Sequence, residues 1–470
     1  MPREPRKRRR RIVLAIVCGA VALTAWVPFH VVWDPLTRLR LAWDMALLRI
    51  TGEPVRVEHL AKLYPEPPAG ENAAELYRRA QRLLWASQDE DLHARPPRQR
   101  LGYRELLAPG AELPAKMLAD IREYLKSQQE PLNLLHEAAT KTGCRFDIEW
   151  SRYLSANWAM GVVPSLQDSA SLLALEAAER AVSGRPDEAA DAASAGLRLA
   201  DALRRIPLWD AQDRATECEG TILDHLEWAL ALGLPSPDAL LRLEEAIGQN
   251  LDRQPLEKWL LTFRCMVICE PALFYVFTGP SDSPGPAERL RRRLEPAKRR
   301  SNTYRPFLRH PRRSLTPREW LFLTKMLNAC IAAARKLYPE ALPAAERIAC
   351  ARLAETTKGR RSCMWDVLVM IDRAQVAAGR LECARTALAV LRYRATHGKL
   401  PEKLDNLVPE FLQSVPPGPF AGEALLYGRE PWGFGVSCSG APIVADLLHG
   451  RPVQYFHRSA RFNVTLPSAQ

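Results

Sequence analysis

Histidines with acidic neighbours are the side chains of this sequence that could take part in acid–base chemistry. Asp224, His225 and Glu227 stand in the segment DHLEW, and His136 precedes Glu137 in HEAAT. A histidine beside a carboxylate can act as a general base, and two histidines four residues apart on a helix can bind zinc. His136 has no such second histidine, and the consecutive Asp224 and His225 point apart on a helix. We predict no catalytic residue at either place and interpret DHLEW as the solvated face of a helix.

Motifs for other kinds of chemistry are absent from the sequence. The string nearest to G-x-S-x-G fails at Ser439, no glycine loop for phosphate opens a helix, and no C-x-x-C occurs. The sequence therefore predicts no cofactor and no bound metal, and it favours a non-enzymatic role.

Cys265 and Cys269 are interpreted as small buried apolar residues. Cys265 and Cys269 are four residues apart, which places them on one face of a helix. Nine cysteines follow residue 33, an odd number, so at least one stays free or pairs between chains. They are Cys144, Cys218, Cys265, Cys269, Cys330, Cys350, Cys363, Cys383 and Cys438.

Positive charge is concentrated in two segments of the 470-residue chain. The formal net charge is +12, of which residues 1–11 carry +6 and residues 289–313 carry +10, so the remainder sums to −4. A mildly acidic body does not offer a nucleic-acid-binding surface. We therefore predict no nucleic-acid partner.

The second basic segment is the candidate site of contact with anions. Pro296, Pro306 and Pro311 exclude one continuous helix, which predicts an exposed loop. Its arginines could contact anionic lipid headgroups, and the alternative is a solvated loop without a ligand. The candidate contact residues are Arg291, Arg292, Arg293, Arg299, Arg300, Arg312 and Arg313.

Residues 12–33 predict a transmembrane signal-anchor. These 22 residues carry no charge, and roughly 20 apolar residues cross a bilayer. The basic residues 1–11 would keep the N-terminus in the cytoplasm, so the expected location is the cytoplasmic (inner) membrane, single pass, with the bulk of the chain extracytoplasmic. The alternative is a cleaved signal peptide, because Ala20-Val21-Ala22 has the form of a cleavage site.

Helical periodicity dominates residues 34 to about 390. Apolar residues recur every three to four positions, and prolines and glycines separate the helices. Residues 172–207 predict a hairpin that turns at Gly184 and looks like a tetratricopeptide hairpin, although no second copy follows at a fixed period. The expected fold is mainly α, an irregular helical bundle or tetratricopeptide-like hairpins after one transmembrane helix, with a small C-terminal α+β cap.

Strand patterns begin only after Gly398. Residues 425–438 predict two short strands around a turn, and residues 441–446 and 452–459 could add more. Gly398 is expected to end the preceding helix in a left-handed conformation, Pro401 prevents its resumption, and Tyr427 should pack back on the helix.

The C-terminal pattern resembles the C-terminal part of type II secretion pseudopilins. In that family a helix ends in Tyr-Arg-x-x-x-Gly-x-x-Pro, followed by a leucine-rich segment, a proline loop and a tyrosine-containing strand. The matching residues are Tyr393, Arg394, Gly398, Pro401, Leu404, Leu407, Val408, Pro409, Leu412, Pro416, Pro419, Phe420, Gly422 and Tyr427.

Two departures separate this chain from the pseudopilins. Gly418 stands where that family keeps an aspartate, and the N-terminus has no prepilin-peptidase motif. The combination is similar instead to a family of membrane-anchored bacterial proteins without an assigned activity, in which E-N-A-A-x-x-Y follows the anchor. Glu71, Asn72, Ala73, Ala74 and Tyr77 match that motif here.

The expected domains are a cytoplasmic tail (1–11), the anchor (12–33), a helical extracytoplasmic domain (34–380) and a pseudopilin-like cap (381–470). The expected function is that of a membrane-anchored scaffold or interaction protein with protein partners in the cell envelope. Two alternatives stay open, an exported hydrolase whose site is assembled from scattered residues and an accessory component of a secretion system. The oligomeric state is left open.

Overall fold

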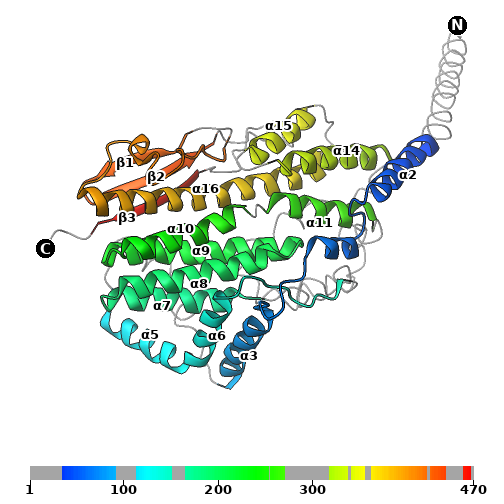
Figure 1. Cartoon of the computed structure of the whole chain (residues 1–470). Helices are drawn as coiled ribbons and strands as arrows, with labels where there is room; N and C mark the ends of the chain where they lie inside the picture. The colour runs from blue at the N-terminus through cyan, green and yellow to red at the C-terminus, as the bar shows by residue number, and fades with distance from the viewer. Residues whose placement is uncertain are drawn as a thin grey trace, which may run out of the picture. The chain divides into compact units, whose positions relative to one another are not determined.

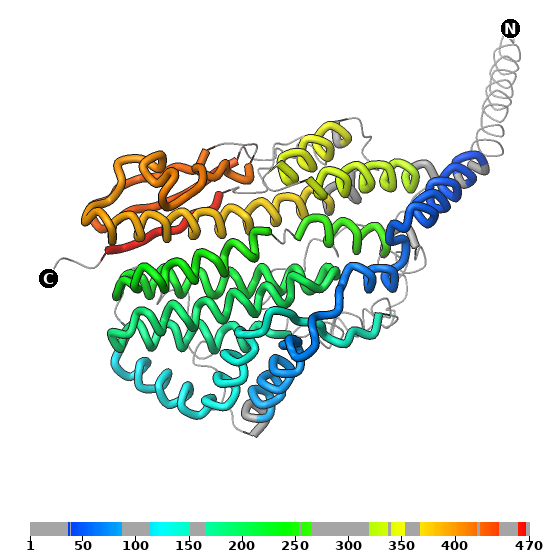
Figure 2. Tube along the Cα trace, in the orientation of Figure 1, coloured from blue at the N-terminus to red at the C-terminus, as the bar shows by residue number. Residues whose placement is uncertain are grey.

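The computed structural model describes residues 34–90, 113–150, 165–252, 255–269, 317–336, 340–354, 361–420, 424–440 and 459–466. They belong to two compact units, one of residues 1–55 and 267–328, the other of residues 56–266 and 329–470. The structure is mainly helical, with a three-stranded antiparallel sheet near the C-terminus (Figures 1 and 2). This confirms the predicted mainly α class with a small C-terminal sheet.

The membrane prediction requires a correction. In the part of the chain that the structure describes, no helix combines the length and the apolarity that crossing a membrane requires. Helix α2 (Asp34–Ile50) has charged residues among its apolar ones, including Arg40 and Asp44, which pair at 3.2 Å. The predicted span itself, residues 12–33, lies outside the described residues. Because no described helix could cross a membrane, the prediction of a single-pass inner-membrane protein is not supported.

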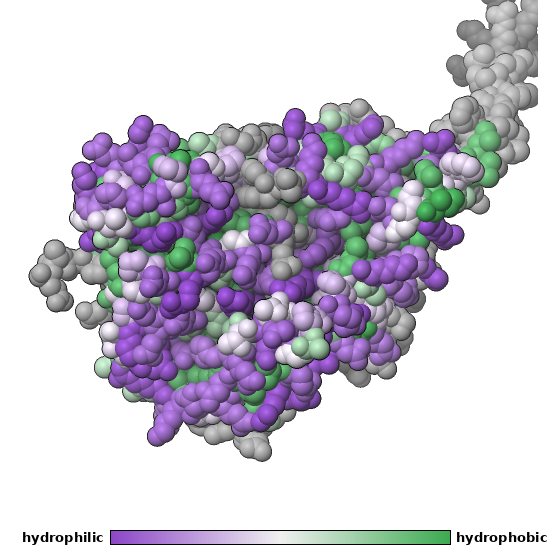
Figure 3. Space-filling model, viewed as in Figure 1, coloured by the Kyte–Doolittle hydropathy of each residue, from purple (hydrophilic) through white to green (hydrophobic). Residues whose placement is uncertain are grey.

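Helix α2, in the first unit, is amphipathic. Its large apolar side chains are exposed and recur every three to four residues, visible as green atoms on this helix in Figure 3. These residues are Leu36, Leu39, Trp43, Leu47 and Ile50.

The second unit is built around a bundle of long helices. Helices α7, α8 and α9 pack on one another, and α10 contacts both α8 and α16. Gly196 allows α8 and α9 to approach closely, because a Cβ at this position would lie 2.2 Å from Cδ1 of Ile222. The predicted hairpin is present, with Gly184 at φ +72° between α7 and α8.

The helices of this unit are α3 (Ala74–Glu90), α5 (Ala115–Ser127), α6 (Gln129–Ala139), α7 (Gln167–Val182), α8 (Pro186–Arg204), α9 (Trp209–Leu232), α10 (Pro237–Asp252), α15 (Ala341–Ala354) and α16 (Arg361–His397). The described part of this unit also contains the 3-10 helices η2 (Val57–Leu63), before α3, and η7 (Leu404–Leu407), after α16. Helices α11 (Leu256–Cys269) and α14 (Pro317–Ala334) each include residues of both units.

The C-terminal sheet packs on α16. Its strands are β1 (Leu426–Glu430), β2 (Gly433–Ser439) and β3 (Ser459–Thr465), in the order β1-β2-β3. The side chains at alternate positions, Phe434 and Val436 on β2 and Phe462 and Val464 on β3, are buried. The two strands predicted in residues 425–438 are confirmed, whereas β3 starts where the predicted run 452–459 ends.

The prediction that Gly398 ends the helix α16 is confirmed. Gly398 has φ +70°, the left-handed conformation that ends a helix. Tyr427 reaches the loop after the helix, where its hydroxyl donates to the carbonyl of Pro401 at 3.1 Å. Nε of Arg429 donates to the same carbonyl at 2.9 Å, so β1 is tied to the helix exit.

Candidate functional site

Two polar side chains fix the start of α3 beside the segment that follows α6. Oε2 of Glu71 accepts hydrogen bonds from the backbone N–H and the hydroxyl of Thr142, at 3.0 and 3.1 Å. Oδ1 of Asn72 accepts from the N–H of Ala74 at 3.1 Å and from that of Arg145 at 2.9 Å, and its Nδ2 donates to the carbonyl of Arg145. Asn72 therefore caps α3 and holds the neighbouring segment at once.

Gly143 allows the two backbones to meet. Its N–H donates to the carbonyl of Glu71 at 3.1 Å, and its own carbonyl accepts from the N–H of Ala73 at 2.9 Å. A Cβ at residue 143 would lie 2.4 Å from Cβ of Pro67, which is closer than two non-bonded carbon atoms can approach. The E-N-A-A segment and the loop after α6 are thus joined by backbone hydrogen bonds into one edge.

A cavity of about 230 Å³ lies at this edge, between the start of α3, the loop after α6, and α8. Ala73 and Tyr77 contribute from the E-N-A-A-x-x-Y segment, and Lys141 and Thr142 from the loop. Gln249 of α10 also lines it. The lining residues with charge are Lys141, Arg198, Asp201 and Arg205.

The pocket has an excess of positive charge. Arg198, Asp201 and Arg205 follow one another at helical spacing, so they share one face at the end of α8. Nε of Arg205 donates to Oδ2 of Asp201 at 3.0 Å, and this pair is neutral as a whole. No ion pair to Arg198 or Lys141 forms among the residues that the structure describes. Two half-buried cations therefore remain to attract an anion.

The other reactive side chains in the pocket are neutral. Burial raises the pKa of the Tyr77 hydroxyl and of the Cys144 thiol above their ordinary values. A thiol acts as a nucleophile only as the thiolate, so the burial of Cys144 disfavours nucleophilic chemistry there. Tyr77 makes no hydrogen bond within the described ranges, and its O–H is a free donor for a ligand.

The residues of DHLEW link α9 to other elements. Asp224 pairs with Arg380 of α16, and Glu227 accepts a hydrogen bond from the N–H of Asn463 on β3 at 2.7 Å. His225 is buried, and its Nδ1 is bonded to a carbonyl one turn earlier at 2.7 Å. The prediction that Asp224 and His225 diverge is confirmed, but the interpretation as a solvated face is wrong for His225.

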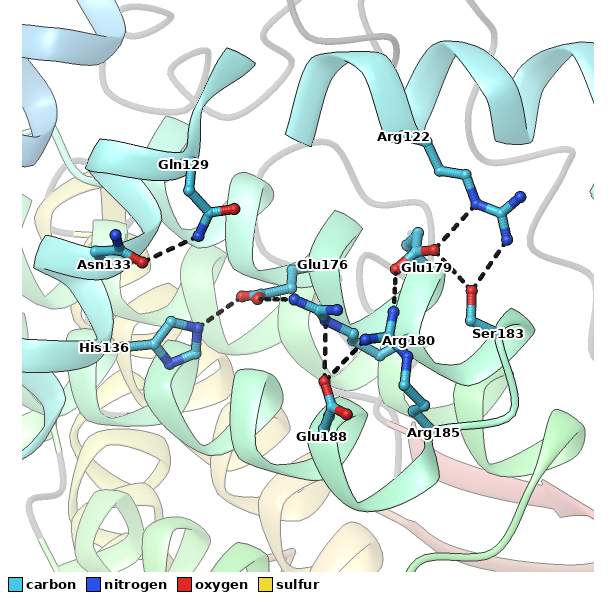
Figure 4. A network of polar contacts seen from close by, with 10 residues as sticks. All are labelled: Arg122, Gln129, Asn133, His136, Glu176, Glu179, Arg180, Ser183, Arg185 and Glu188. Atoms are coloured by element: carbon cyan, nitrogen blue, oxygen red, sulfur yellow. Dashed lines mark hydrogen bonds and ion pairs between the residues drawn. The ribbon is translucent and has the colours of Figure 1, made fainter. Parts of the chain in front are cut away.

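His136 belongs to a polar network that joins α5, α6 and the α7–α8 hairpin (Figure 4). Nε2 of His136 lies 2.7 Å from Oε2 of Glu176, whose Oε1 accepts from Arg180. Each carboxylate of the network has a cationic partner, so its charges are balanced, unlike those of the pocket. The further charged members are Arg122, Glu179, Arg185 and Glu188.

The His136–Glu176 pair is expected to make stability depend on pH. The hydrogen bond to Glu176 raises the pKa of His136 above its ordinary value of 6.5. A raised folded-state pKa gives stability that is complete below pH 6.5 and is lost as the pH rises through the folded-state value. We expect the urea midpoint of wild type to fall between pH 6 and pH 8 more than that of His136→Gln. Parallel pH profiles for the two proteins would contradict this.

No family model, curated protein or solved structure matches this chain. The resemblance to the pseudopilins thus stays a prediction. The arginines proposed from the sequence as anion contacts, within residues 291–313, lie outside the described residues. Neither His136 nor His225 lines the pocket.

Sequence analysis missed this pocket, although one signal was present. Arg198 lies on the alanine-rich α8 and Arg205 is its C-cap residue. Their spacing of seven residues puts two cations on one side of a helix that is otherwise mostly buried.

Proposed function

We propose that this protein is a helical binding module that holds a small anionic ligand in the pocket between α3, α6 and α8. The observation that carries the proposal is the presence of two half-buried cations, Lys141 and Arg198, in one cavity without a carboxylate partner among the described residues. The proposal keeps the expected role of a scaffold or interaction protein and gives it a ligand class.

The ligand class follows from the donors that surround the cavity. Guanidinium groups bind carboxylates and phosphates through paired N–H donors, and an ammonium group adds a point charge. The hydroxyl of Tyr77 supplies a further donor. The hydroxyl of Thr142 already donates to Glu71, and the carboxylate of Asp201 is held by Arg205. A volume of about 230 Å³ fits a compact carboxylate or phosphate compound.

The test is calorimetric titration of the full chain with inorganic phosphate and with succinate, against sodium chloride at equal ionic strength. We expect heat of binding with at least one of the two anions and none with chloride. Arg198→Gln should weaken that affinity by about tenfold or more, because a hydrogen bond to a charged group contributes about 1.5–3 kcal/mol.

Arg242→Gln is the matched control. Arg242 lies on α10 and pairs with Asp191 at 2.8 Å, both half exposed, and it does not line the pocket. Its replacement should leave anion affinity unchanged. If neither anion binds wild type, or if the two variants lose affinity equally, the proposal fails.

We further propose that the sheet and the loop after α16 form the pseudopilin-like cap expected from the sequence. Its support is the left-handed Gly398 at the end of α16, followed by a proline-rich loop and antiparallel strands. We assign this cap a structural role. An accessory role in secretion rests on the likeness alone, and recovery of secretion components with the tagged chain would support it.

A further inference from the structure

Two buried cysteines meet where the C-terminal sheet packs on α16. Cys383 lies on α16 and Cys438 on β2, with their Sγ atoms 3.9 Å apart and their side chains 0% and 2% exposed. They are 55 positions apart in the sequence, so the contact is made by the docking of the sheet. Sγ of Cys383 also lies 3.7 Å from the carbonyl of Ala460 on β3.

Gly379 creates the space in which these sulfurs meet. A Cβ at Gly379, one turn before Cys383, would lie 3.0 Å from Sγ of Cys438 and 2.9 Å from Cβ of Ala460. Any larger residue would push β2 and β3 away from the helix. A disulfide would require the two sulfurs to approach from 3.9 Å to about 2.05 Å.

Neither sulfur belongs to another polar site. Within the described ranges, no group of three histidine, cysteine or acidic side chains could hold a metal ion. Cys330, by comparison, is buried elsewhere and its Sγ contacts the carbonyl of Ala345. The sulfurs of Cys383 and Cys438 thus contact each other without taking part in a metal-binding cluster of the described residues.

We propose that Cys383 and Cys438 form a disulfide that fastens the C-terminal sheet to α16 when the chain folds in the presence of a small disulfide oxidant. Before the sheet docks, the thiolate of one cysteine attacks the oxidant R–S–S–R and releases R–S⁻. Docking of the sheet then brings the second cysteine to this mixed disulfide. Its thiolate attacks the protein sulfur, forms the Cys383–Cys438 bond and releases the second R–S⁻. Two thiols lose two electrons and two protons, and the oxidant becomes two molecules of R–SH.

The proposal does not depend on the anion pocket, and its test has two readouts. The full chain is treated with oxidised glutathione at a urea concentration below its unfolding midpoint, blocked with N-ethylmaleimide, and digested without reduction. We expect linked peptides containing Cys383 and Cys438, lighter by two hydrogen atoms than the sum of the reduced pair. The Tm of the oxidised protein should exceed that of the reduced protein by several degrees.

Cys438→Ala and Cys330→Ala are the paired variants. The Cys438 variant should show the same Tm oxidised and reduced, whereas the Cys330 variant should keep both the linked peptide and the shift. Recovery of Cys383 and Cys438 of wild type as N-ethylmaleimide adducts would overturn the proposal. So would a link from either of them to a different cysteine.

Discussion

Replacing Arg204 by methionine is expected to lower the free energy of unfolding by about 3–5 kcal/mol. Arg204 forms a two-pronged ion pair with Glu219, with Nε–Oε1 and Nη2–Oε2 distances of 2.9 and 2.6 Å. Only 1% of the Arg204 side chain and 3% of the Glu219 side chain are exposed. Without the guanidinium group, Glu219 would remain as a buried charge without compensation. Urea unfolding followed by circular dichroism measures the loss.

A double variant distinguishes the broken pair from lost packing. Arg204 also donates to the carbonyl of Gln212 and to the hydroxyl of Thr216, at 3.2 and 2.9 Å, and it links α8 to α9 through these contacts. Replacing both charges by apolar side chains, in Arg204→Met with Glu219→Leu, removes the buried charge as well. We expect the double variant to be more stable than Arg204→Met alone. A double variant that is less stable than the single one would show that the loss does not arise from the unpaired Glu219.

Gly433→Ala is expected to detach β2 from β3. Gly433 has φ +151°, and a Cβ there would lie 2.0 Å from the carbonyl oxygen of Val464 in the backbone of β3. Backbone strain alone costs about 1–3 kcal/mol, and the strands must also separate to remove the clash. We expect much faster hydrogen exchange in residues 433–439 and 459–465.

Gly428→Ala is the control for this variant. Gly428 lies on the neighbouring strand β1, and no heavy atom lies within 4 Å of the position of its Cβ. Alanine there should leave exchange in β2 and β3 unchanged. Equal protection of β2 and β3 in wild type and in Gly433→Ala would contradict the expected clash.

The helical part of the fold was predictable because its signals are local. The spacing of apolar residues, Gly184 in the turn between α7 and α8, and Gly398 at the end of α16 each depend on a few neighbouring residues. Both glycines have the positive φ that such positions require. The strand β3 was mostly missed, since it forms by pairing with β2 and its own alternation is short.

The candidate site was not predictable in the same way. Lys141 follows α6, whereas Arg198 lies on α8 and Arg205 directly follows that helix, and nothing in their local sequences says that they share a cavity. Of the histidines that sequence analysis examined for chemistry, His136 bonds to Glu176 on another helix, and His225 bonds to a carbonyl of its own helix. A polar residue in a helical sequence can face solvent, a partner helix or a ligand, and the spacing alone does not distinguish these.

By itself the sequence determined a chain of helices, two of its turns and a small sheet after Gly398, because backbone preference and apolar periodicity act over a few residues. Only the tertiary structure decided that Glu71 and Asn72 bind the loop after α6 through hydrogen bonds. It also decided that Lys141 and Arg198 line one pocket, and that the sulfurs of Cys383 and Cys438 are in contact. These contacts join residues far apart in the chain. They depend on how closely helices and strands pack, which small residues such as Gly143, Gly196 and Gly379 control.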